Sequence, residues 1–430
     1  MSESIAPSPS LAHHHEERQR LFWRNYPALA AEGGIYMGGL AFIHMNAVLP
    51  RMIESLGGPQ WIIAFTPIVM FMGVTSVQVF VARYIESLSR MKPLVMLTGV
   101  FQRLPYLLAG LFLFYKADQY PAVAVAVLVL APLMSGLAAG LSMSAWQELV
   151  AKTIPENRLS SLWALRFVIA ALIGLVAGRV IELVLANHPG SHGFGILHLI
   201  AFSFLLMSYV IFGFTRETNL PPKRSKDERG NWREFIRDIP ATLKADKRLT
   251  LYLCGRFFWM GIHIVVPFLS IFAIHELQLP DTYLGRFLIA QTIGILAGNA
   301  IGAFVGDRLG GKTVSIICQS AFLLLCILSY GVSTIFGFYA LFFLLGFSMI
   351  GGKIGTQTLG FEISPLKKRV AYLSMQNFFL FPGMLLASTS SSIIRQFTLD
   401  FYVLTIPSMV MVVISILFLL QVQEPRKGSL

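Results

Sequence analysis

The stretch "GDRLGGK" (Gly306–Lys312) stands between two long apolar runs, and this short charged segment decides how the chain is folded. The runs are "YLGRFLIAQTIGILAGNAIGAFV" (283–305) and "TVSIICQSAFLLLCILSY" (313–330). A helix needs about 20 apolar residues to cross the hydrocarbon of a bilayer. The pattern therefore predicts two membrane-spanning helices joined by a tight turn, in which Gly310 and Gly311 allow the chain to reverse.

The composition of the whole chain agrees with this local pattern. Its 430 residues are 55% hydrophobic and only 13% charged, whereas soluble domains carry about 25% charged residues. Lipid offers no water to backbone polar groups, so spans are helices or closed barrels, and these continuous runs predict helices. The net charge of +12 fits basic cytoplasmic loops. We therefore expect an all-α membrane protein with no nucleic-acid partner.

We count twelve spans, and an even number places both termini on the same side of the membrane. If that side is the cytoplasm, the inner segments hold 25 of the 34 Lys and Arg residues, and the outer loops hold three, Arg51, Lys116 and Arg395. This asymmetry predicts cytoplasmic termini in a multi-pass protein of the inner (plasma) membrane. The predicted spans are roughly 29–49, 61–82, 93–115, 121–147, 161–187, 195–215, 249–274, 283–306, 313–331, 337–360, 370–394 and 401–421.

The longest inner segment, 216–248, divides the chain into two sets of six spans. We expect a cytoplasmic tail at 1–28, a first bundle at 29–215, a second bundle at 249–421 and a second tail at 422–430. Within 216–248, one predicted face carries Trp232, Phe235, Ile236, Ile239 and Leu243, with basic residues opposite. This pattern is typical of an amphipathic helix on the inner membrane surface.

The two halves repeat the same markers in the same order. The corresponding pairs are Glu86 with Asp307, His44 in "FIHMNAVLP" with His263 in "GIHIVVP", Arg158 with Arg369, Arg166 with Asn377, and "RE" at 216–217 with "QE" at 423–424. These markers, repeated at similar spacing, indicate an internal repeat of six helices.

These features resemble the major facilitator superfamily of secondary transporters, over nearly the whole chain. That family carries a pattern G-x-x-x-D-R-x-G-R-K after its second and eighth helices. The second copy here has Asp307, Arg308, Gly310 and Lys312, with Ala303 in place of the first Gly; the first copy departs further, with Glu86, Ser87 and Ser89 before Arg90 and Lys92. The resemblance implies two pseudo-symmetric six-helix bundles.

The resemblance also implies that the charged turns act as a gate. Glu86, Arg90, Asp307, Arg308, Gly310 and Lys312 would then hold the two halves in one of two alternating states. The simpler interpretation is that these charges only fix the topology.

Family members bind substrate near the membrane midplane, mostly on helices 1, 4, 7 and 10. His44 and His263 lie at matching mid-membrane positions of helices 1 and 7. Because imidazole titrates near neutral pH, the pair is a candidate for substrate binding or proton transfer. The alternative is a pair of packed core histidines.

Two basic residues at similar depth suggest an anionic substrate. These are Arg256 on helix 7 and Lys353 on the glycine-rich helix 10, where the glycines predict a bend beside the cavity. The alternative is that they snorkel or pair with Glu148. Hydrogen bonds to substrate are expected from Asn46, Gln357, Gln376 and Asn377.

Other charged residues inside the spans are expected to serve structure. Arg179 and Glu182 are three residues apart and predict an ion pair. Arg103 and Arg166 are expected to brace helices. Glu32 and Glu148, the latter at the inner end of helix 4, are lesser proton candidates.

The leading hypothesis is a monomeric secondary transporter of a small polar or anionic solute, coupled to protons and embedded in lipid. One rival is an efflux carrier for amphiphiles or drugs, supported by 34 Phe and 17 Met that suit a pliable apolar cavity. The other is a transporter-like sensor or assembly partner without flux. No enzyme activity, cofactor or metal site is expected: the tail residues His13–His15 have no other ligands nearby, and the chain has no phosphate-binding glycine loop.

Overall fold

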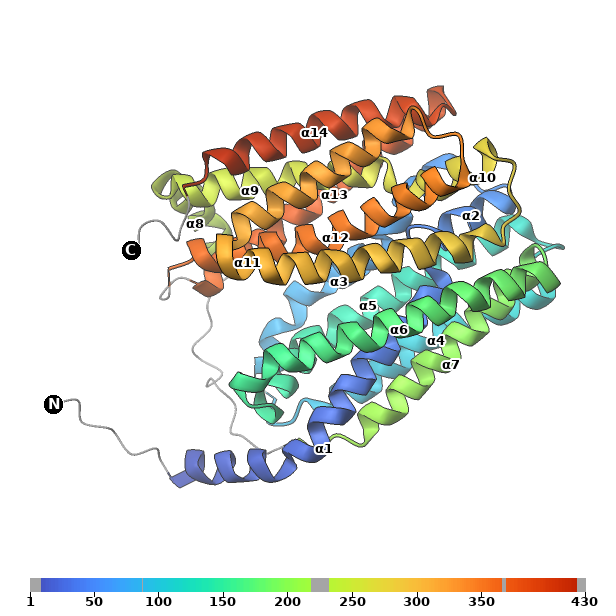
Figure 1. The fold of residues 1–430 in the computed structure, drawn as a ribbon. Coiled ribbons are helices and arrows are strands. Elements are labelled where there is room, and N and C mark those ends of the chain that lie inside the picture. The colour runs from blue at the N-terminus through green and yellow to red at the C-terminus, as the bar shows by residue number, and fades with distance from the viewer. Residues whose placement is uncertain (1–8, 87, 218–231, 366–368, 424–430) are drawn as a thin grey trace.

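The computed structural model describes residues 9–86, 88–217, 232–365 and 369–423, and every regular element in these ranges is a helix. The helices form two groups that lie side by side, one built from α1 to α7 and the other from α9 to α14 (Figure 1). Both ends of the chain lie at the same end of the molecule, as the even number of spans predicts (Figure 1).

The first group begins with a helix that breaks partway along its length. Its elements are α1 (Pro9–Gly39), the short 3-10 helix η1 (Leu40–Ile43), α2 (Val48–Ser55), α3 (Gln60–Glu86), α4 (Lys92–Lys116), α5 (Pro121–Thr153), α6 (Glu156–Asn187) and α7 (Ser191–Gly213). The predicted span at 29–49 is not one unbroken helix, because α1 ends at Gly39 and the chain continues through η1 to α2. The helix α1 begins at Pro9, within the predicted tail of 1–28.

The second group repeats this arrangement after the short helix α8. Its elements are α8 (Trp232–Ala245), α9 (Lys247–Trp259), η2 (Met260–Ile264), η3 (Val266–Phe268), α10 (Leu269–Glu276), α11 (Tyr283–Ser329), α12 (Ile335–Ile363), α13 (Arg369–Phe397) and α14 (Phe401–Gln421). Among the described residues, ten stretches are long and apolar enough to cross a membrane. One of them is α11, whose 47 residues are enough for two crossings. With the broken helix α1–η1–α2, the fold accommodates the twelve predicted spans.

The charged turn reverses the chain at Gly310, within α11. Gly310 has φ 85° and ψ 168°, which is not helical and which residues with a side chain rarely adopt. At Gly311 a Cβ atom would lie 2.3 Å from the backbone nitrogen of Leu359, so the turn packs directly on the backbone of α12. The predicted reversal at these two glycines is confirmed.

The helices that carry the two repeated histidines break at equivalent places. His44 follows η1 with an extended ψ of 119°, and its carbonyl oxygen accepts from the backbone nitrogens of Ala47, Val48 and Leu49. His263 lies inside η2, between α9 and α10. Discontinuous helices near the midplane are typical of transporter binding sites, because they expose backbone groups there.

The repeat also extends to the ends of the last helices of each bundle. Lys92 Nζ donates to the carbonyl oxygens of Gly213 and Thr215, both at 2.8 Å, where α7 ends. Lys312 Nζ donates to those of Leu420 at 3.0 Å and Val422 at 2.6 Å, where α14 ends. Each lysine therefore neutralises the carbonyl end of the last helix in its own bundle.

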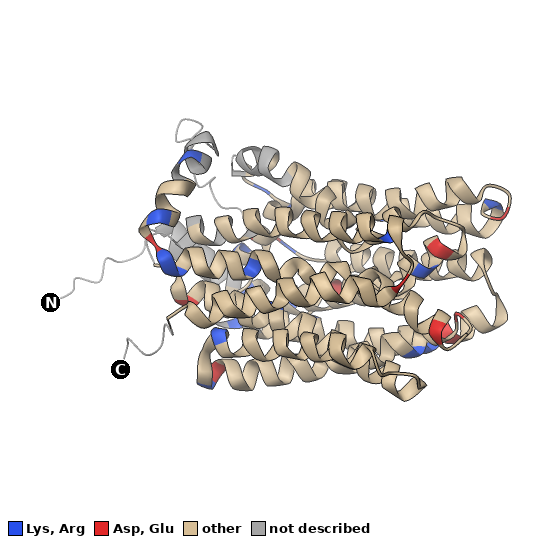
Figure 2. Cartoon of the chain, turned by 90° about the horizontal axis from the view of Figure 1, so that it is seen from above, with Lys and Arg blue, Asp and Glu red and all other residues tan. Residues whose placement is uncertain are grey.

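Most of the charged residues lie near the two ends of the helices, and only a few coloured segments lie between them (Figure 2). At one of these ends, α8 covers the second bundle. Ile239 is buried and Leu243 packs beside it, in a cluster that includes Leu249 and Tyr252. The described apolar side chains of this predicted amphipathic helix therefore pack against the second bundle. The side chains of Trp232, Phe235 and Ile236 lie outside the described part of the chain.

Candidate functional site

A cavity of about 710 Å³ lies between the two bundles, and both bundles contribute to its wall. The first bundle supplies the break after η1 and part of α3, and the second supplies α9, η2, α12 and α13. The lining residues are Met45, Asn46, Pro67, Met70, Phe71, Val74, Arg256, Trp259, Met260, Ile262, His263, Met349, Lys353, Thr356, Gln357, Phe361, Gln376, Leu380 and Met384.

Two cations line this cavity, and no Asp or Glu is among the described residues that line it. Arg256 is 9% exposed. Its Nη1 donates to Gln376 Oε1 at 3.1 Å and to the Tyr252 hydroxyl at 3.3 Å, while its Nε has no hydrogen-bond partner. Lys353 is exposed to the cavity and forms no ion pair or hydrogen bond within the described ranges. Both acceptors of Arg256 are neutral, so the wall carries two uncompensated positive charges.

Glycines bring α12 close enough to its neighbours to hold Lys353 at the cavity. A Cβ at Gly346 would lie 2.0 Å from the carbonyl oxygen of Gln291, and one at Gly355 would lie 2.5 Å from the backbone nitrogen of Ser315. These glycines do not interrupt α12, which runs as one α-helix from Ile335 to Ile363. The glycines instead allow backbone contact with α11.

The polar lining includes three of the predicted hydrogen-bonding residues. Asn46 Nδ2 contacts Met349 Sδ at 3.8 Å, across the boundary between the bundles. Gln357 is exposed to the cavity, and Gln376 is held by Arg256. The side chain of Asn377 lies outside the described part of the chain.

The two repeated histidines are placed differently. His263 lines the cavity, and its Nδ1 is buried without a hydrogen-bond partner. His44 has an equally unpartnered Nδ1, but it is not among the residues that line the cavity. Glu148, half-buried on α5, does not line it either. The structure thus brings together Asn46, Arg256, His263, Lys353 and Gln357, and leaves His44 and Glu148 outside this group.

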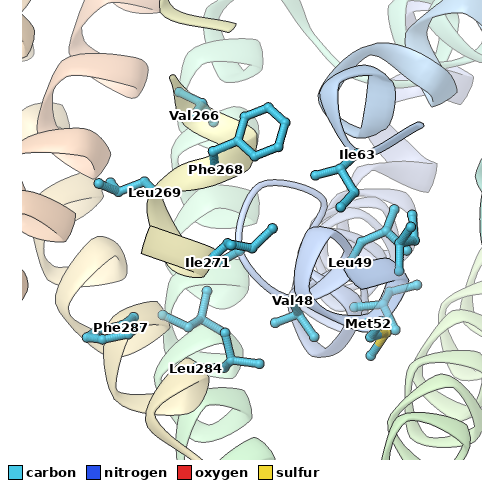
Figure 3. Packing of buried hydrophobic residues seen from close by; sticks show 14 of the residues in the cluster. Val48, Leu49, Met52, Ile63, Val266, Phe268, Leu269, Ile271, Leu284 and Phe287 are labelled. Carbon is cyan, nitrogen blue, oxygen red and sulfur yellow. The ribbon is translucent and has the colours of Figure 1, made fainter. Parts of the chain in front are cut away.

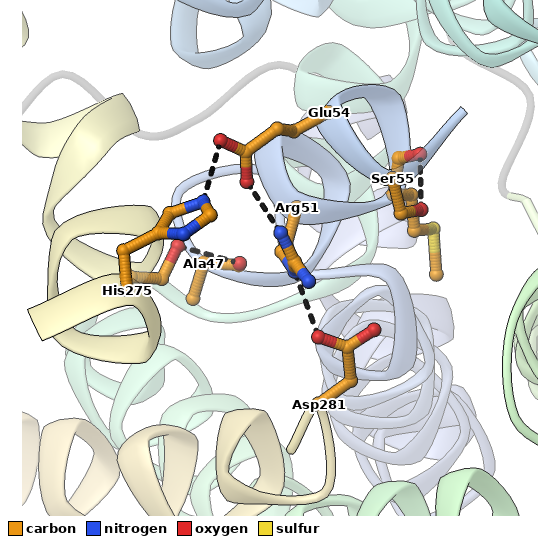
Figure 4. A network of polar contacts seen from close by, with 8 residues as sticks. Ala47, Arg51, Glu54, Ser55, His275 and Asp281 are labelled. Carbon is orange, nitrogen blue, oxygen red and sulfur yellow. Dashed lines mark hydrogen bonds and ion pairs between the residues drawn. The ribbon is translucent and has the colours of Figure 1, made fainter. Parts of the chain in front are cut away.

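At the end of the molecule opposite the start of α1, a polar network joins the two bundles (Figure 4). The charge asymmetry of the sequence predicts that this end faces outward, so it is called the outer end and the opposite one the inner end. Arg51 of α2 donates from Nε to Asp281 at 2.7 Å and from Nη1 to Glu54 at 2.6 Å. The other oxygen of Glu54 lies 3.0 Å from His275 Nε2 on α10. Ser270 also donates across the boundary, to the carbonyl oxygen of Ala47 at 2.9 Å. Our sequence analysis recognised only the position of Arg51 on the outer side.

Apolar side chains close the space beneath this network (Figure 3). Side chains of α2 and α3 face those of η3 and α10, and all belong to one buried cluster that spans both bundles. The labelled members are Val48, Leu49, Met52 and Ile63 of the first bundle, and Val266, Phe268, Leu269, Ile271, Leu284 and Phe287 of the second. This apolar layer packs the two bundles together.

A second contact between the bundles runs along α6 and α11. A Cβ at Gly285 would lie 2.0 Å from the carbonyl oxygen of Gly178, so the two backbones touch. The predicted pair of Arg179 and Glu182 is present at 2.6 Å, and Glu182 also accepts from Arg286 Nη2 of α11 at 2.6 Å. The carboxylate thus bridges the two bundles.

The residues assigned to gating lie at the inner end of the molecule. Arg308 is exposed and sits over the Phe304 ring at 4.0 Å, and Asp307 and Arg90 are also exposed. The side chain of Glu86 lies outside the described part of the chain. Glu217, which the sequence marked only as part of the repeat, also lies here. It accepts from the backbone nitrogens of Met91 and Lys92 at the start of α4, and lies 3.9 Å from Lys152 Nζ.

No family model matches the sequence, and no curated protein matches it. Solved structures do match over 92% of the chain. A mutant of the nucleoside transporter NupG has a TM-score of 0.69 at 13% identity, with 98% of its own chain covered. A bacterial homologue of the iron transporter ferroportin has a TM-score of 0.68 at 15% identity in its inward-facing state, with 98% of that chain covered. In its outward-facing state the score is 0.59 at 17% identity, with the same coverage.

At these identities the likeness concerns the fold. It agrees with the two side-by-side groups of helices described above. The chain is a multi-pass helical membrane protein with the fold of the major facilitator superfamily.

Proposed function

We propose that this chain is a secondary active transporter of amphipathic organic anions, which works by alternating access at the cavity between its bundles. The observation that carries the proposal is the pair of cations, Arg256 and Lys353, on a wall without described carboxylates. Uncompensated charge at this depth in a membrane protein is costly, and a bound anion offsets that cost. Metal cations are disfavoured by the same charge.

The rest of the wall indicates what the body of the solute is like. Five methionines and several aromatic rings surround the two cations, and methionine adapts its shape to varied apolar surfaces. A carboxylate, phosphonate or sulfate head would sit near Lys353, while an apolar body would lie against Met45, Met349 and Met384. This combines the anionic substrate of our leading hypothesis with the amphiphiles of its first rival.

The contacts between the bundles support an inward-facing arrangement. The network of Arg51, Glu54, His275 and Asp281 and the apolar layer below it close the outer end. The higher TM-score to the inward-facing state of the ferroportin homologue is in line with this. Both termini would then be cytoplasmic, at the end where the basic turns lie, in an inner or plasma membrane. Coupling to protons would use His263, the titratable imidazole on the cavity wall.

The direct test is transport by the purified protein in liposomes. Vesicles loaded with an unlabelled solute should exchange it for labelled solute outside, and a panel would compare medium-chain carboxylates and sulfonates with amines and neutral sugars. We expect exchange of the amphipathic anions only. Exchange of amines in preference to anions would contradict the proposal, and binding without any exchange would favour the sensor hypothesis.

A further inference from the structure

A second polar cavity, of about 120 Å³, lies wholly within the first bundle. It shares no lining residue with the central cavity. Helices α1, α4, α5, α6 and α7 enclose it, and its lining residues are Glu32, Tyr36, Val95, Gln102, Arg103, Ala139, Ser142, Met143, Trp146, Arg166, Tyr209 and Phe212. The function proposed above does not use it.

Three charged side chains meet at this cavity, and each is more than nine-tenths buried. Arg166 is 6% exposed, and Arg103 and Glu32 are each 7% exposed. Arg166 Nη1 lies 3.3 Å from Glu32 Oε2, which pairs one cation with the carboxylate. Arg103 donates only to neutral acceptors, the carbonyl oxygens of Gly99 and Leu205 and the side chains of Gln102 and Ser208. The cluster therefore keeps a net charge of one positive unit.

Arg166 also keeps one edge of its guanidinium unused. Both of its hydrogen bonds start from Nη1, to Glu32 and to the carbonyl oxygen of Leu29. Its Nε is buried without a partner, and within the described part of the chain no hydrogen bond starts from Nη2. The Nε and Nη2 groups point in parallel, which is the geometry that binds both oxygens of a carboxylate.

The surroundings hold the guanidinium in this position. Trp146 and Trp163 place their ring centres 4.7 Å and 5.1 Å from Arg166 Cζ. Gly33 leaves room on α1, since a Cβ there would lie 1.8 Å from the same atom. A side chain fixed in this way is prepared for a ligand, because little further ordering is needed on binding.

We propose that this cavity binds a small monovalent carboxylate, held by the Nε and Nη2 edge of Arg166 and by the positive charge of Arg103. Such a ligand would neutralise the net charge of the cluster and satisfy the unused donors. The size is suitable, because a cavity of about 150 Å³ accepts benzene. The site is independent of the central cavity, and its ligand is smaller than the amphipathic anions proposed there.

The test measures binding of acetate and trifluoroacetate to the whole protein in detergent, in a buffer free of other carboxylates and of halide. Unfolding temperature reports stabilisation by acetate, and fluorine NMR line broadening reports binding of trifluoroacetate. We expect saturable stabilisation that is lost in Arg166→Gln and kept in Lys353→Gln, which alters only the central cavity. Chloride and sulfate at the same concentrations should stabilise the protein less.

A second variant is expected to bind acetate more tightly, and such a gain cannot result from failed folding. Glu32→Gln removes the competing carboxylate and raises the net charge of the cluster, so acetate should bind at least about tenfold more tightly, a change of 1.4 kcal/mol in binding free energy. A purely structural cluster would show no such gain. Unchanged or weaker binding in Glu32→Gln would overturn the proposal. Loss of acetate binding in Lys353→Gln instead of Arg166→Gln would also overturn it, by placing the ligand in the central cavity.

Discussion

Arg51 Nε donates to Asp281 Oδ1 at 2.7 Å, and this contact joins the first bundle to the second at the outer end of the molecule (Figure 4). The two side chains are 18% and 21% exposed. A partly exposed pair of this kind contributes about 0–1 kcal/mol to stability. That small energy would suit a contact that the proposed alternating-access cycle breaks and remakes.

Reversing the charge of Arg51 should therefore open the outer end. Arg51→Asp would place a third carboxylate beside those of Asp281 and Glu54, and like charges at this distance repel. A reporter cysteine at Asn46, in a background without Cys254, Cys318 and Cys326, should react faster with a membrane-impermeant thiol reagent added outside.

The charge-swapped double variant provides the control for this effect. Arg51→Asp with Asp281→Arg should restore most of the slow labelling, because the pair is re-formed in reverse. Lys116→Asp changes another outer basic residue, which bonds only to Gln119 of its own bundle, and should leave labelling unchanged. Equal labelling in Arg51→Asp and wild type would argue against the view that the contact of Arg51 with Asp281 keeps this end closed.

The turn at Gly310 gives a prediction about stability. Gly311→Ala would bring a Cβ to 2.3 Å from the Leu359 backbone nitrogen and 2.6 Å from the Gly355 carbonyl oxygen, so one helix has to move. Overpacking of this kind costs about 1–3 kcal/mol. Gly331→Ala is the matched control, since nothing lies within 4 Å of a Cβ there. Thermal unfolding in detergent should show a lower midpoint for Gly311→Ala only, and equal midpoints would contradict the packing argument.

The sequence predicted the fold well because hydropathy and charge act locally. The turn of Gly306–Lys312 lies between two apolar runs that are each long enough to cross a bilayer. The reversal of the chain could therefore be predicted from residues that are close together in the sequence. The repeat was also visible, and His44 and His263 correctly marked equivalent positions. The sequence did not reveal that both helices break at these histidines, because "FIHMNAVLP" and "GIHIVVP" remain mostly apolar.

The site was harder to predict, because it depends on which side of each helix faces the cavity. Arg256, Lys353 and His263 were placed on the right helices, and the structure puts all three on one wall. His44 was predicted at the same depth as His263, and Glu148 at the inner end of its helix. Rotation of each helix decides which side chains face the cavity, and hydropathy does not report that rotation. Glu54, His275 and Asp281 were missed because contacts between distant residues leave no local pattern.

Lys353 and Arg256 should differ in how they respond to removal of their charge. Lys353 has no partner within the described ranges, so Lys353→Gln should leave thermal stability nearly unchanged, yet weaken binding of the amphipathic anion by at least about tenfold, or 1.4 kcal/mol. Arg256→Gln should weaken binding and also lower stability, because Tyr252 and Gln376 lose a donor. Calorimetric titration and thermal unfolding separate the two effects. Unaltered anion affinity in Lys353→Gln would remove the basis for the proposed substrate class.

Binding of the anion should also take up a proton through His263. This imidazole shares the cavity with Arg256 and Lys353, and two nearby cations oppose a third positive charge. A bound anion offsets that repulsion and favours the protonated form, so each ligand strengthens binding of the other. Affinity for the anion should therefore rise as the pH falls from about 8 to 5, the range in which histidine changes its charge.

The measurement is anion affinity across that pH range, together with proton uptake in weak buffer. His263→Gln should flatten the pH dependence and abolish the uptake, and His44→Gln should have the smaller effect because His44 does not line the cavity. His188→Gln, on an exposed outer turn, is the control. If the pH dependence persists in His263→Gln but disappears in His44→Gln, the titrating group lies outside the cavity wall, and coupling would have to act through the break between η1 and α2 instead of through direct contact with the anion.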